Sequence, residues 1–334
     1  MTAESEHKQV AKDPAEVLRR LLNIAAGGDQ ELCARYAQYL VASRGVAAGN
    51  TLAAWITGLK RWISFAATRQ APAVPARWEV VVDYIDHLAT QHRFTTIQTR
   101  VWAIARLHLA AKLPSPTSIA DVGLAMKRVA RALGKRKRHA RGAWLNHITL
   151  MHGTTDTSLR GLRDRAMTLL AYDLSARQSE LMALDIDDIS PAANGNGSAL
   201  IAQSKTDQFG RRERVFIARD TMVAIDAWCQ AAKLVDGALF RSIDRWGNVG
   251  PRLSSRGLSY TAKRLAAAAE LGDGYSGHSF RVGAAQEMVA NNMNLAGVLQ
   301  AQRRKHADSL HPYLEDIEIE RSAMADLARL QGRA

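Results

Sequence analysis

The chain has 334 residues, 47% of them hydrophobic, so its length predicts two domains with ordinary cores. The formal net charge of +13 favours a polyanionic partner, most often a nucleic acid. The only cysteines, Cys33 and Cys229, exclude a disulfide framework and a cysteine-based zinc site, and we expect buried thiols in a reducing compartment. No apolar run approaches the roughly 18 residues of a membrane span, and the charged N-terminus lacks a signal-peptide core. We therefore expect a cytoplasmic protein.

The N-terminal part of the chain carries helical patterning after a polar start. Residues 1–13 are polar, and we expect them to be disordered. Within 14–133 apolar residues recur at three- and four-residue spacing, most clearly in 52–66, which is typical of amphipathic helices. Thr51 and Thr96 are expected to start two of these helices. The pattern predicts a small helical bundle with short loops.

A basic run joins the two periodic parts of the chain. Residues 127–141 contain eight Lys or Arg and no acid. Such a run is usually a solvated segment, but its place between two periodic regions indicates a linker, residues 134–143, that tracks phosphates. The residues expected to contact DNA there are Lys135, Arg136, Lys137 and Arg138.

Residues 144–334 predict a second domain that is mostly helical with a small antiparallel sheet. Two short strands are expected to pair as a hairpin around the loop KTDQFGRR. The turn cluster NGNGS precedes this hairpin. The whole chain is thus expected to be mainly α. The expected elements are a helix at 159–172, strands at 183–190, 199–203 and 213–218, and helices at 220–234, 256–271 and 280–291.

Three separated segments and a late tyrosine supply the side chains that phosphoryl transfer through a tyrosyl nucleophile requires. Guanidinium groups match the charge on the non-bridging oxygens of the transition state, and a lysine is suited to protonating the leaving oxygen. A phosphotyrosine stores the bond energy, so rejoining needs no ATP. No acidic cluster has metal-ligand spacing, and we expect no metal and no cofactor. The candidates are Arg177 and Glu180 in LSARQSEL, Lys205 in QSKTDQFG, His278 and Arg281 in SGHSFRVGAA, and Tyr313.

Each of these signals is weak when taken alone. Arg177 with Glu180 would usually be a surface ion pair, Lys205 a solvated turn residue, and Tyr313 a half-buried packing residue. A histidine three residues before an arginine is common. The order and the sequence contexts of the segments together favour the catalytic interpretation.

These segments resemble the motifs of the tyrosine site-specific recombinases, the phage integrase family, and among them those of the Cre type. LSARQSEL is similar to the first arginine box of the family, and SGHSFRVGAA is similar to the second almost residue for residue. The N-terminal half is similar in outline to the core-binding domain, including TTIQTR (95–100) and the LPSP turn (113–116). The similarity covers nearly the whole chain.

The resemblance implies a DNA strand transferase with chemistry like that of type IB topoisomerases. It implies cleavage and rejoining of DNA through a 3′-phosphotyrosyl intermediate and a Holliday junction. Its implied partners are double-stranded DNA with an inverted-repeat site and three further copies of the chain, in a nucleoid of prokaryotic, phage or plasmid origin. The implied roles are Tyr313 as nucleophile, Arg177 and Arg281 as phosphate clamp, Lys205 as proton donor, His278 in proton transfer, and Glu180 as accessory acid.

One position departs from the family pattern. The family usually has Trp or His nine residues before the tyrosine, and this chain has Arg304 there. Either Arg304 contacts the phosphate or this element is built differently. Pro312 disfavours helical geometry at the residue before it, so we expect Tyr313 in the first turn of a helix.

The resemblance also implies the surfaces that meet DNA and neighbouring copies. An apolar stripe after Tyr313 is expected to dock into a neighbouring protomer and close a tetramer. The alternative functions are an inactive DNA-binding regulator of the same fold, and the same chemistry used as an integrase or a telomere resolvase. The residues expected to contact DNA in the two domains are Thr51, Lys60, Arg61, Thr96, Gln98, Thr99, Arg100 and Arg256.

Overall fold

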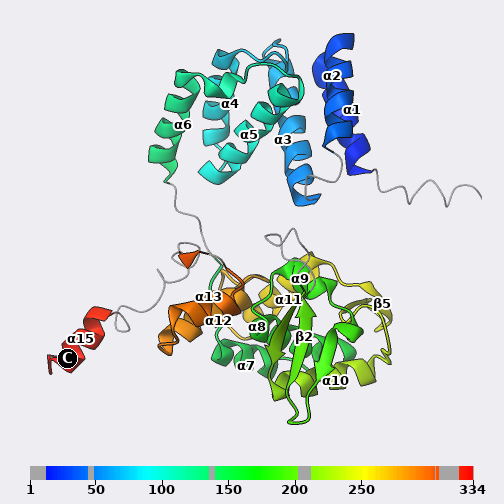
Figure 1. Ribbon diagram of the computed structural model, residues 1–334, viewed down its shortest axis with the longest axis vertical. Coiled ribbons are helices and arrows are strands. Elements are labelled where there is room, and N and C mark those ends of the chain that lie inside the picture. The colour runs from blue at the N-terminus through cyan, green and yellow to red at the C-terminus, as the bar shows by residue number, and fades with distance from the viewer. Residues whose placement is uncertain are drawn as a thin grey trace, which may run out of the picture. The chain divides into compact units, whose positions relative to one another are not determined.

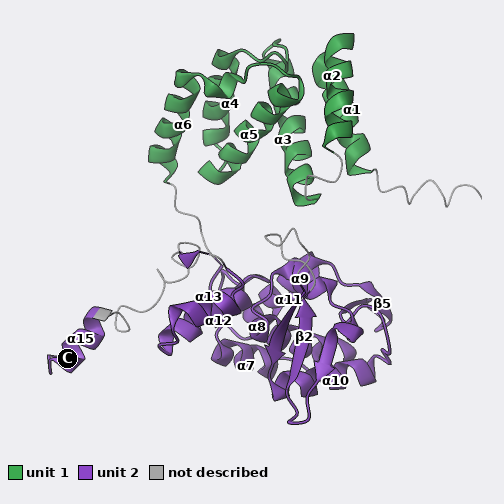
Figure 2. Cartoon of the chain, viewed as in Figure 1, with its two compact units in different colours: residues 1–137 green, residues 138–334 purple. Residues whose placement is uncertain are grey.

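The structure, a computed structural model, describes residues 13–43, 49–134, 140–201, 212–304, 306–307 and 323–333. The chain divides into two compact units, residues 1–137 and residues 138–334 (Figure 2). Each unit has its own core of buried apolar side chains. The fold is mainly α with small antiparallel sheets, which confirms the predicted fold class.

Unit 1 is a bundle of helices (Figure 1). The Asp13 carboxylate accepts a hydrogen bond from the Ala15 N–H (3.0 Å), and Asp29 accepts one from the Leu32 N–H (3.1 Å). Asp13, expected to be disordered, is thus an ordered helix cap. The helices are α1 (Pro14–Ala26), α2 (Gln30–Ala42), α3 (Gly49–Thr68), α4 (Trp78–Ala89), α5 (Phe94–Ala110) and α6 (Ala120–Leu133), with a 3-10 turn at Pro116–Ser118.

Helices α3 and α5 approach closely in the centre of unit 1. A Cβ placed at Gly58 on α3 would lie 2.5 Å from the Cβ of Ala103 on α5, so the contact requires a residue without a side chain. The predicted apolar face of α3 is buried, with Leu59 and Trp62 fully enclosed. The indole Nε1 of Trp62 donates to the Ala73 carbonyl oxygen (2.9 Å), which satisfies its only polar atom.

Two helix starts in unit 1 differ from the prediction. Helix α3 begins at Gly49 and α5 begins at Phe94, each two residues before the expected threonines Thr51 and Thr96. Arg93 occupies the N-cap of α5 and makes no side-chain cap. Phe94 is buried, so packing of this ring extends the helix beyond the residue that capping preference alone would select.

Unit 2 combines helices with two small sheets. Strands β1 (Ile189–Pro191), β2 (Gly197–Ile201) and β3 (Glu213–Ile217) form an antiparallel sheet in that order, which confirms the predicted pairing of the hairpin strands. The helices are α7 (Leu145–Gly153), α8 (Leu159–Asp173), α9 (Gln178–Ala183), α10 (Arg219–Ala231), α11 (Ser255–Ala268), α12 (Ser279–Ala290), α13 (Leu295–Ala301) and α15 (Ala323–Leu330).

The strand expected at 183–190 is wrong. Ala183 ends α9, residues 186–188 form a 3-10 turn, and only the last residues of the segment pair as β1. The apolar residues of this segment suit a strand, but local capping decides otherwise. The Asp188 carboxylate accepts from the Asp185 N–H (2.9 Å), which closes the turn between α9 and β1.

The sequence reading also missed the second sheet, in which β4 (Arg241–Ile243) pairs with β5 (Val249–Arg252). Asp244 organises the turn between these strands, because its carboxylate accepts from the backbone N–H groups of Trp246 (2.8 Å) and Asn248 (2.9 Å). The strands are only 3 and 4 residues long, too short for an alternating pattern to reveal them.

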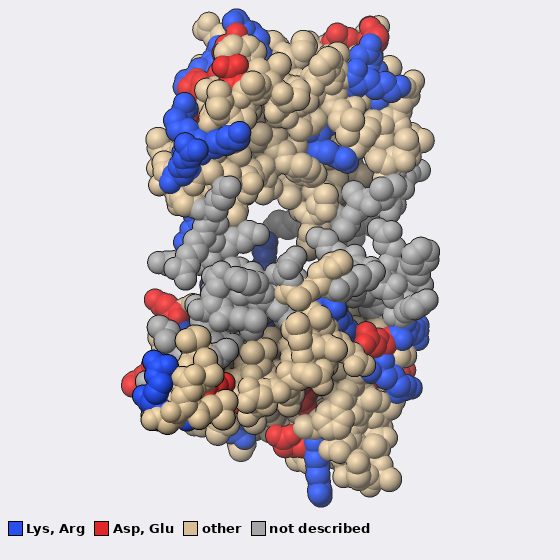
Figure 3. Space-filling view, turned by 60° about the vertical axis from the view of Figure 1, so that its left-hand side comes forward, with Lys and Arg blue, Asp and Glu red and all other residues tan. Residues whose placement is uncertain are grey.

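The surface and the cysteines refine the expectations from composition. On the face drawn in Figure 3, each unit carries basic side chains with acidic ones beside them. Cys33 and Cys229 are half-buried free thiols in different units, so the expected full burial is wrong. Burial raises the pKa of Cys229 to about 11. Among the described helices, none has the length and apolar content that a bilayer crossing needs.

Candidate active site

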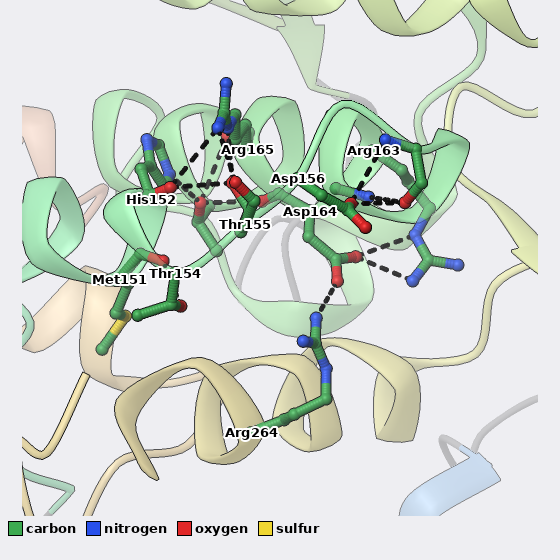
Figure 4. Close-up of polar contacts among 12 residues, drawn as sticks. Met151, His152, Thr154, Thr155, Asp156, Arg163, Asp164, Arg165 and Arg264 are labelled. Carbon is green, nitrogen blue, oxygen red and sulfur yellow. Dashed lines mark hydrogen bonds and ion pairs between the residues drawn. The ribbon is translucent and has the colours of Figure 1, made fainter. Parts of the chain in front are cut away.

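The long helix α8 carries the loop on which the candidate site is built, and a buried carboxylate anchors this helix. Asp164 is fully buried and accepts hydrogen bonds from Arg163 Nη2 (2.7 Å) and Nε (3.0 Å). Arg264 reaches the same carboxylate from α11 (Figure 4). Arg163 also donates to the Arg241 carbonyl oxygen in β4 (3.2 Å). This network ties α8 to α11 and β4.

Arg281, in the first turn of α12, lies at the centre of the candidate site. Its residue surface is 1% exposed, and its guanidinium donates to the carbonyl oxygens of Ser175 and Gln302. These carbonyls follow the C-terminal ends of α8 and α13, where helices concentrate partial negative charge. Burial, together with the nearby charges of Arg177, Arg304 and Arg303, lowers the pKa of Arg281 to about 9. The fold therefore buries one guanidinium group close to three others.

Glu180, the acid of the first motif, is buried beside these arginines. One carboxylate oxygen accepts from Arg177 Nη1 (2.5 Å) and the other from the Arg177 backbone N–H (2.9 Å). Its side chain is 3% exposed, so the pair is not the surface ion pair that the motif alone would allow. Burial pushes the pKa of Glu180 upward, but hydrogen bonds from Arg177 and the charges of Arg303 and Arg177 outweigh it and lower the pKa.

Residues Gln302 and Arg303, which the sequence reading missed, complete the cluster. Arg303 Nη2 donates to Glu180 Oε2 (2.9 Å), and its Nη1 donates to the Leu174 carbonyl oxygen (2.7 Å). Gln302 is fully buried, and its side-chain amide donates to Ser175 Oγ and to the Arg281 carbonyl oxygen (3.2 Å). The run QRRK contains both residues, but the family spacing of nine residues before the tyrosine selects only Arg304.

The remaining predicted residues divide between described and undescribed parts of the chain. Arg304 is half-buried and near enough to Arg281 to lower its pKa. His278 occupies the N-cap of α12, where its backbone N–H donates to Ser276 Oγ (3.3 Å). The structure thus brings together four of the predicted residues, Arg177, Glu180, Arg281 and Arg304, and His278 occupies the N-cap of the helix that carries Arg281. Lys205, Tyr313 and the linker residues Lys135, Arg136, Lys137 and Arg138 lie outside the described residues.

Unit 1 presents a basic hollow where two predicted DNA-contacting helices meet α4. The hollow has a volume of about 380 Å³, and its described lining residues include arginines, histidines and polar groups but no acid. Arg61 from α3 and Arg100 from α5 both line it. The other predicted DNA-contacting residues of unit 1 lie outside the lining of this hollow. Lys60, Gln98 and Thr99 are exposed, and Thr51 and Thr96 are half-buried. Arg256 is exposed in the first turn of α11 in unit 2.

The described residues contain no group of three or more His, Cys, Asp or Glu side chains placed to hold a metal ion. The guanidinium groups of the candidate site are suited to an anion. Guanidinium groups in pairs match the oxygens of a phosphate.

Comparison with characterised proteins gives two relatives of similar length. The chain is 28% identical over 287 residues to the integrase/recombinase xerD homolog of Selenomonas ruminantium, covering 81% of this chain and 83% of the relative. It is 24% identical over 289 residues to the recombinase cre of Escherichia phage P1, covering 80% and 84%. Both relatives thus span most of the chain.

Solved structures show the same fold. XerH site-specific recombinase bound to palindromic difH substrate matches with a TM-score of 0.62 at 12% identity, covering 96% of this chain and 97% of XerH. A lambda integrase tetramer bound to a Holliday junction matches with a TM-score of 0.57 at 15% identity, covering 88% and 80%. The phage integrase family model matches residues 146–313, which include the arginine cluster. The chain belongs to the phage integrase family of tyrosine recombinases, which are DNA strand-transferring enzymes.

Proposed function

We propose that the chain is a site-specific recombinase in which Tyr313 attacks a DNA phosphate clamped by Arg177 and Arg281. The observation that carries this proposal is the charge of the cluster. Four guanidinium groups, those of Arg177, Arg281, Arg303 and Arg304, surround the one carboxylate of Glu180 among the described residues. A surplus of buried positive charge is costly without an anion, and a phosphodiester supplies one.

In the proposed reaction, the Tyr313 phenol oxygen forms a bond to phosphorus while the bond from phosphorus to the 5′ oxygen breaks. Arg281 is held by two carbonyl oxygens and does not need to reorganise as charge develops on the non-bridging oxygens. Lys205 protonates the departing 5′ oxygen, and His278 assists the proton transfer from the tyrosine. Arg304 is placed to contact the same phosphate.

Rejoining reverses these steps. The 5′ hydroxyl of a partner strand attacks the phosphotyrosine, so the number of phosphodiester bonds is unchanged and no ATP is consumed. Two rounds of exchange pass through a Holliday junction. The solved relative that holds such a junction as a tetramer supports this sequence of events for the present chain.

The proposed DNA interface uses the basic hollow of unit 1 and the start of α11. Arg61 and Arg100 bind phosphates at the hollow, while Gln98 is placed on an exposed face where it reaches base edges. Lys60, Thr51, Thr96, Thr99, Arg256 and the linker residues Lys135, Arg136, Lys137 and Arg138 add to this interface. Because phosphate contacts dominate, binding is expected to weaken steeply with salt.

We further propose that α15 joins neighbouring copies into a tetramer on two DNA sites. Met324 and Leu330 are 69% and 87% exposed, so the apolar side of α15 is uncovered within its own chain. We place the enzyme at the nucleoid of a prokaryotic cell, with a phage or plasmid origin, because that is where its DNA substrate lies.

The test is a single-turnover cleavage assay on a nicked DNA substrate carrying the inverted-repeat site that the protein selects from a random pool. Separation on a denaturing gel detects covalent protein–DNA adduct. We expect Tyr313→Phe to abolish the adduct and to leave DNA affinity unchanged, because the ring remains and only the attacking oxygen is lost.

A second tyrosine provides the matched control. Tyr260 is 68% exposed on α11, and Tyr260→Phe removes a hydroxyl from the same unit without touching the arginine cluster. An adduct that survives Tyr313→Phe would overturn the assignment of the nucleophile. No adduct with the unaltered protein would favour the DNA-binding regulator instead.

A further inference from the structure

Arg303 occupies a backbone position that favours glycine. The N–H groups of Arg303 and Arg304 donate to the carbonyl oxygens of Gln300 (2.8 Å) and Leu299 (2.9 Å), the pattern of a Schellman turn at the end of α13. In this turn Arg303 has φ 48°, in the left-handed region. A residue with a Cβ is strained there, so the arginine is retained at a conformational cost.

The side chain of Arg303 is enclosed, and both of its terminal nitrogens donate hydrogen bonds. It is 5% exposed and donates to the carbonyl oxygens of Leu174 (2.7 Å) and Ser175 (3.2 Å) as well as to the Glu180 carboxylate (2.9 Å). Leu174 and Ser175 belong to the loop between α8 and α9, and Glu180 belongs to α9, all more than a hundred residues earlier in the chain. The contacts join the end of α13 to the loop that presents Arg177.

Both clamp arginines depend on groups that Arg303 holds. The Glu180 carboxylate accepts hydrogen bonds from the Nη1 and the backbone N–H of Arg177. The Ser175 carbonyl oxygen accepts from Arg281 and from Arg303 together. Arg303 therefore contacts Glu180, which binds Arg177, and the Ser175 carbonyl oxygen, which binds Arg281. Its own side chain is buried.

We propose that Arg303 is a positioning residue for strand cleavage: it fixes Glu180 and the Ser175 carbonyl, and thereby aims Arg177 and Arg281 at the phosphate. This inference rests on the proposed function of the cluster. It assigns the two consecutive arginines different tasks, since Arg303 acts through other side chains and Arg304 faces the reacting phosphate.

Arg303→Gly is the decisive variant, because glycine suits the left-handed backbone and removes only the side chain. We expect a folded protein with unchanged DNA affinity and a cleavage rate lower by about 100-fold, the effect of a small misplacement of catalytic groups. We also expect the loss to deepen toward mildly acidic pH. Burial raises the pKa of Glu180, and without the opposing charge of Arg303 its carboxylate takes up a proton and releases Arg177. Arg303→Lys is expected to restore part of the rate.

Arg252 offers a matched control. It makes the same type of contacts, to the carbonyl oxygens of Met182 (2.9 Å) and Leu184 (3.1 Å) and to the Asp185 carboxylate (2.5 Å), but at the other end of α9. Arg252→Ala is expected to leave the pH profile of cleavage unchanged. If Arg252→Ala lost cleavage rate at acidic pH as Arg303→Gly does, the effect would reflect a general destabilisation of unit 2. That result would overturn the proposal.

A wild-type rate and pH profile for Arg303→Gly would also overturn it, as would a lysine variant no better than glycine. These results differ from a failure of the proposed function. In that case the unaltered protein forms no adduct, or the adduct persists in Tyr313→Phe.

Discussion

The residues of the active site show how a fold holds several positive charges together. Arg281 is enclosed, and the carbonyl oxygens that follow the ends of α8 and α13 accept hydrogen bonds from its guanidinium. The neighbouring guanidinium groups still depress its pKa. A site of this kind is prepared for an anion, because a bound phosphate relieves the repulsion that folding imposes.

At the residue scale, Arg281→Lys tests this preparation. Lysine keeps a charge but is a point charge, so it is not suited to holding both carbonyl oxygens and the phosphate at once. We expect the rate of adduct formation to fall by about 100-fold or more, while half-site affinity in gel shifts changes little. A lysine variant that cleaves at the wild-type rate would show that planar, paired donors are not needed at this position.

At the scale of elements, the ends of short helices hold the residues of the candidate site. Arg177 and His278 occupy the N-caps of α9 and α12, and Arg303 follows the end of α13. Helix ends expose backbone groups that side chains then satisfy, so several functional residues also complete the secondary structure around them. The long helix α8 carries this arrangement, and its anchoring decides how accurately the ends meet.

The anchor of α8 yields a stability prediction. Asp164→Ala would leave Arg163 enclosed without a carboxylate partner, and would free Arg264 from α8. Removing one partner of a buried ion network typically costs about 3–5 kcal/mol. We expect a loss of this size in the unfolding free energy of unit 2, measured by chemical denaturation. Asp185→Ala removes the acid of the more exposed ion pair with Arg252. This change is expected to lower the unfolding free energy by less than about 1 kcal/mol. Equal losses would contradict the role assigned to Asp164.

At the scale of the whole molecule, assembly and DNA binding are expected to depend on different surfaces. In the proposed assembly, DNA affinity is expected to depend on the basic residues of unit 1 and α11, and tetramer formation on the exposed apolar residues of α15. Removing one surface should therefore leave the other property intact.

Deletion of residues 320–334 tests this separation. We expect normal binding to a single half-site but loss of the slower complexes that contain two DNA sites, in the same series of gel shifts. Leu330→Asp is a milder variant that charges the most exposed apolar residue of α15. Equal loss of half-site binding and assembly would show that α15 stabilises its own chain instead.

Much of the fold could be read from the sequence, because its signals are local. Periodic apolar residues marked the helices of unit 1, and a turn-rich loop between two short runs marked the hairpin of β2 and β3. The failures also have local causes. Residues 183–190 have strand-like composition, but the hydrogen bond from the Asp185 N–H to the Asp188 carboxylate closes a turn within them. Strands β4 and β5 are too short to show an alternating pattern.

The sequence by itself determined the chemical groups of the site, since two motifs name Arg177, Glu180, His278 and Arg281 in order. Only the tertiary structure decided that Glu180 is shared between Arg177 and Arg303, whose contact spans 123 positions of the chain. The reason is physical. Motifs record which groups are close along the chain, whereas burial and shared hydrogen bonds join groups that folding alone brings together.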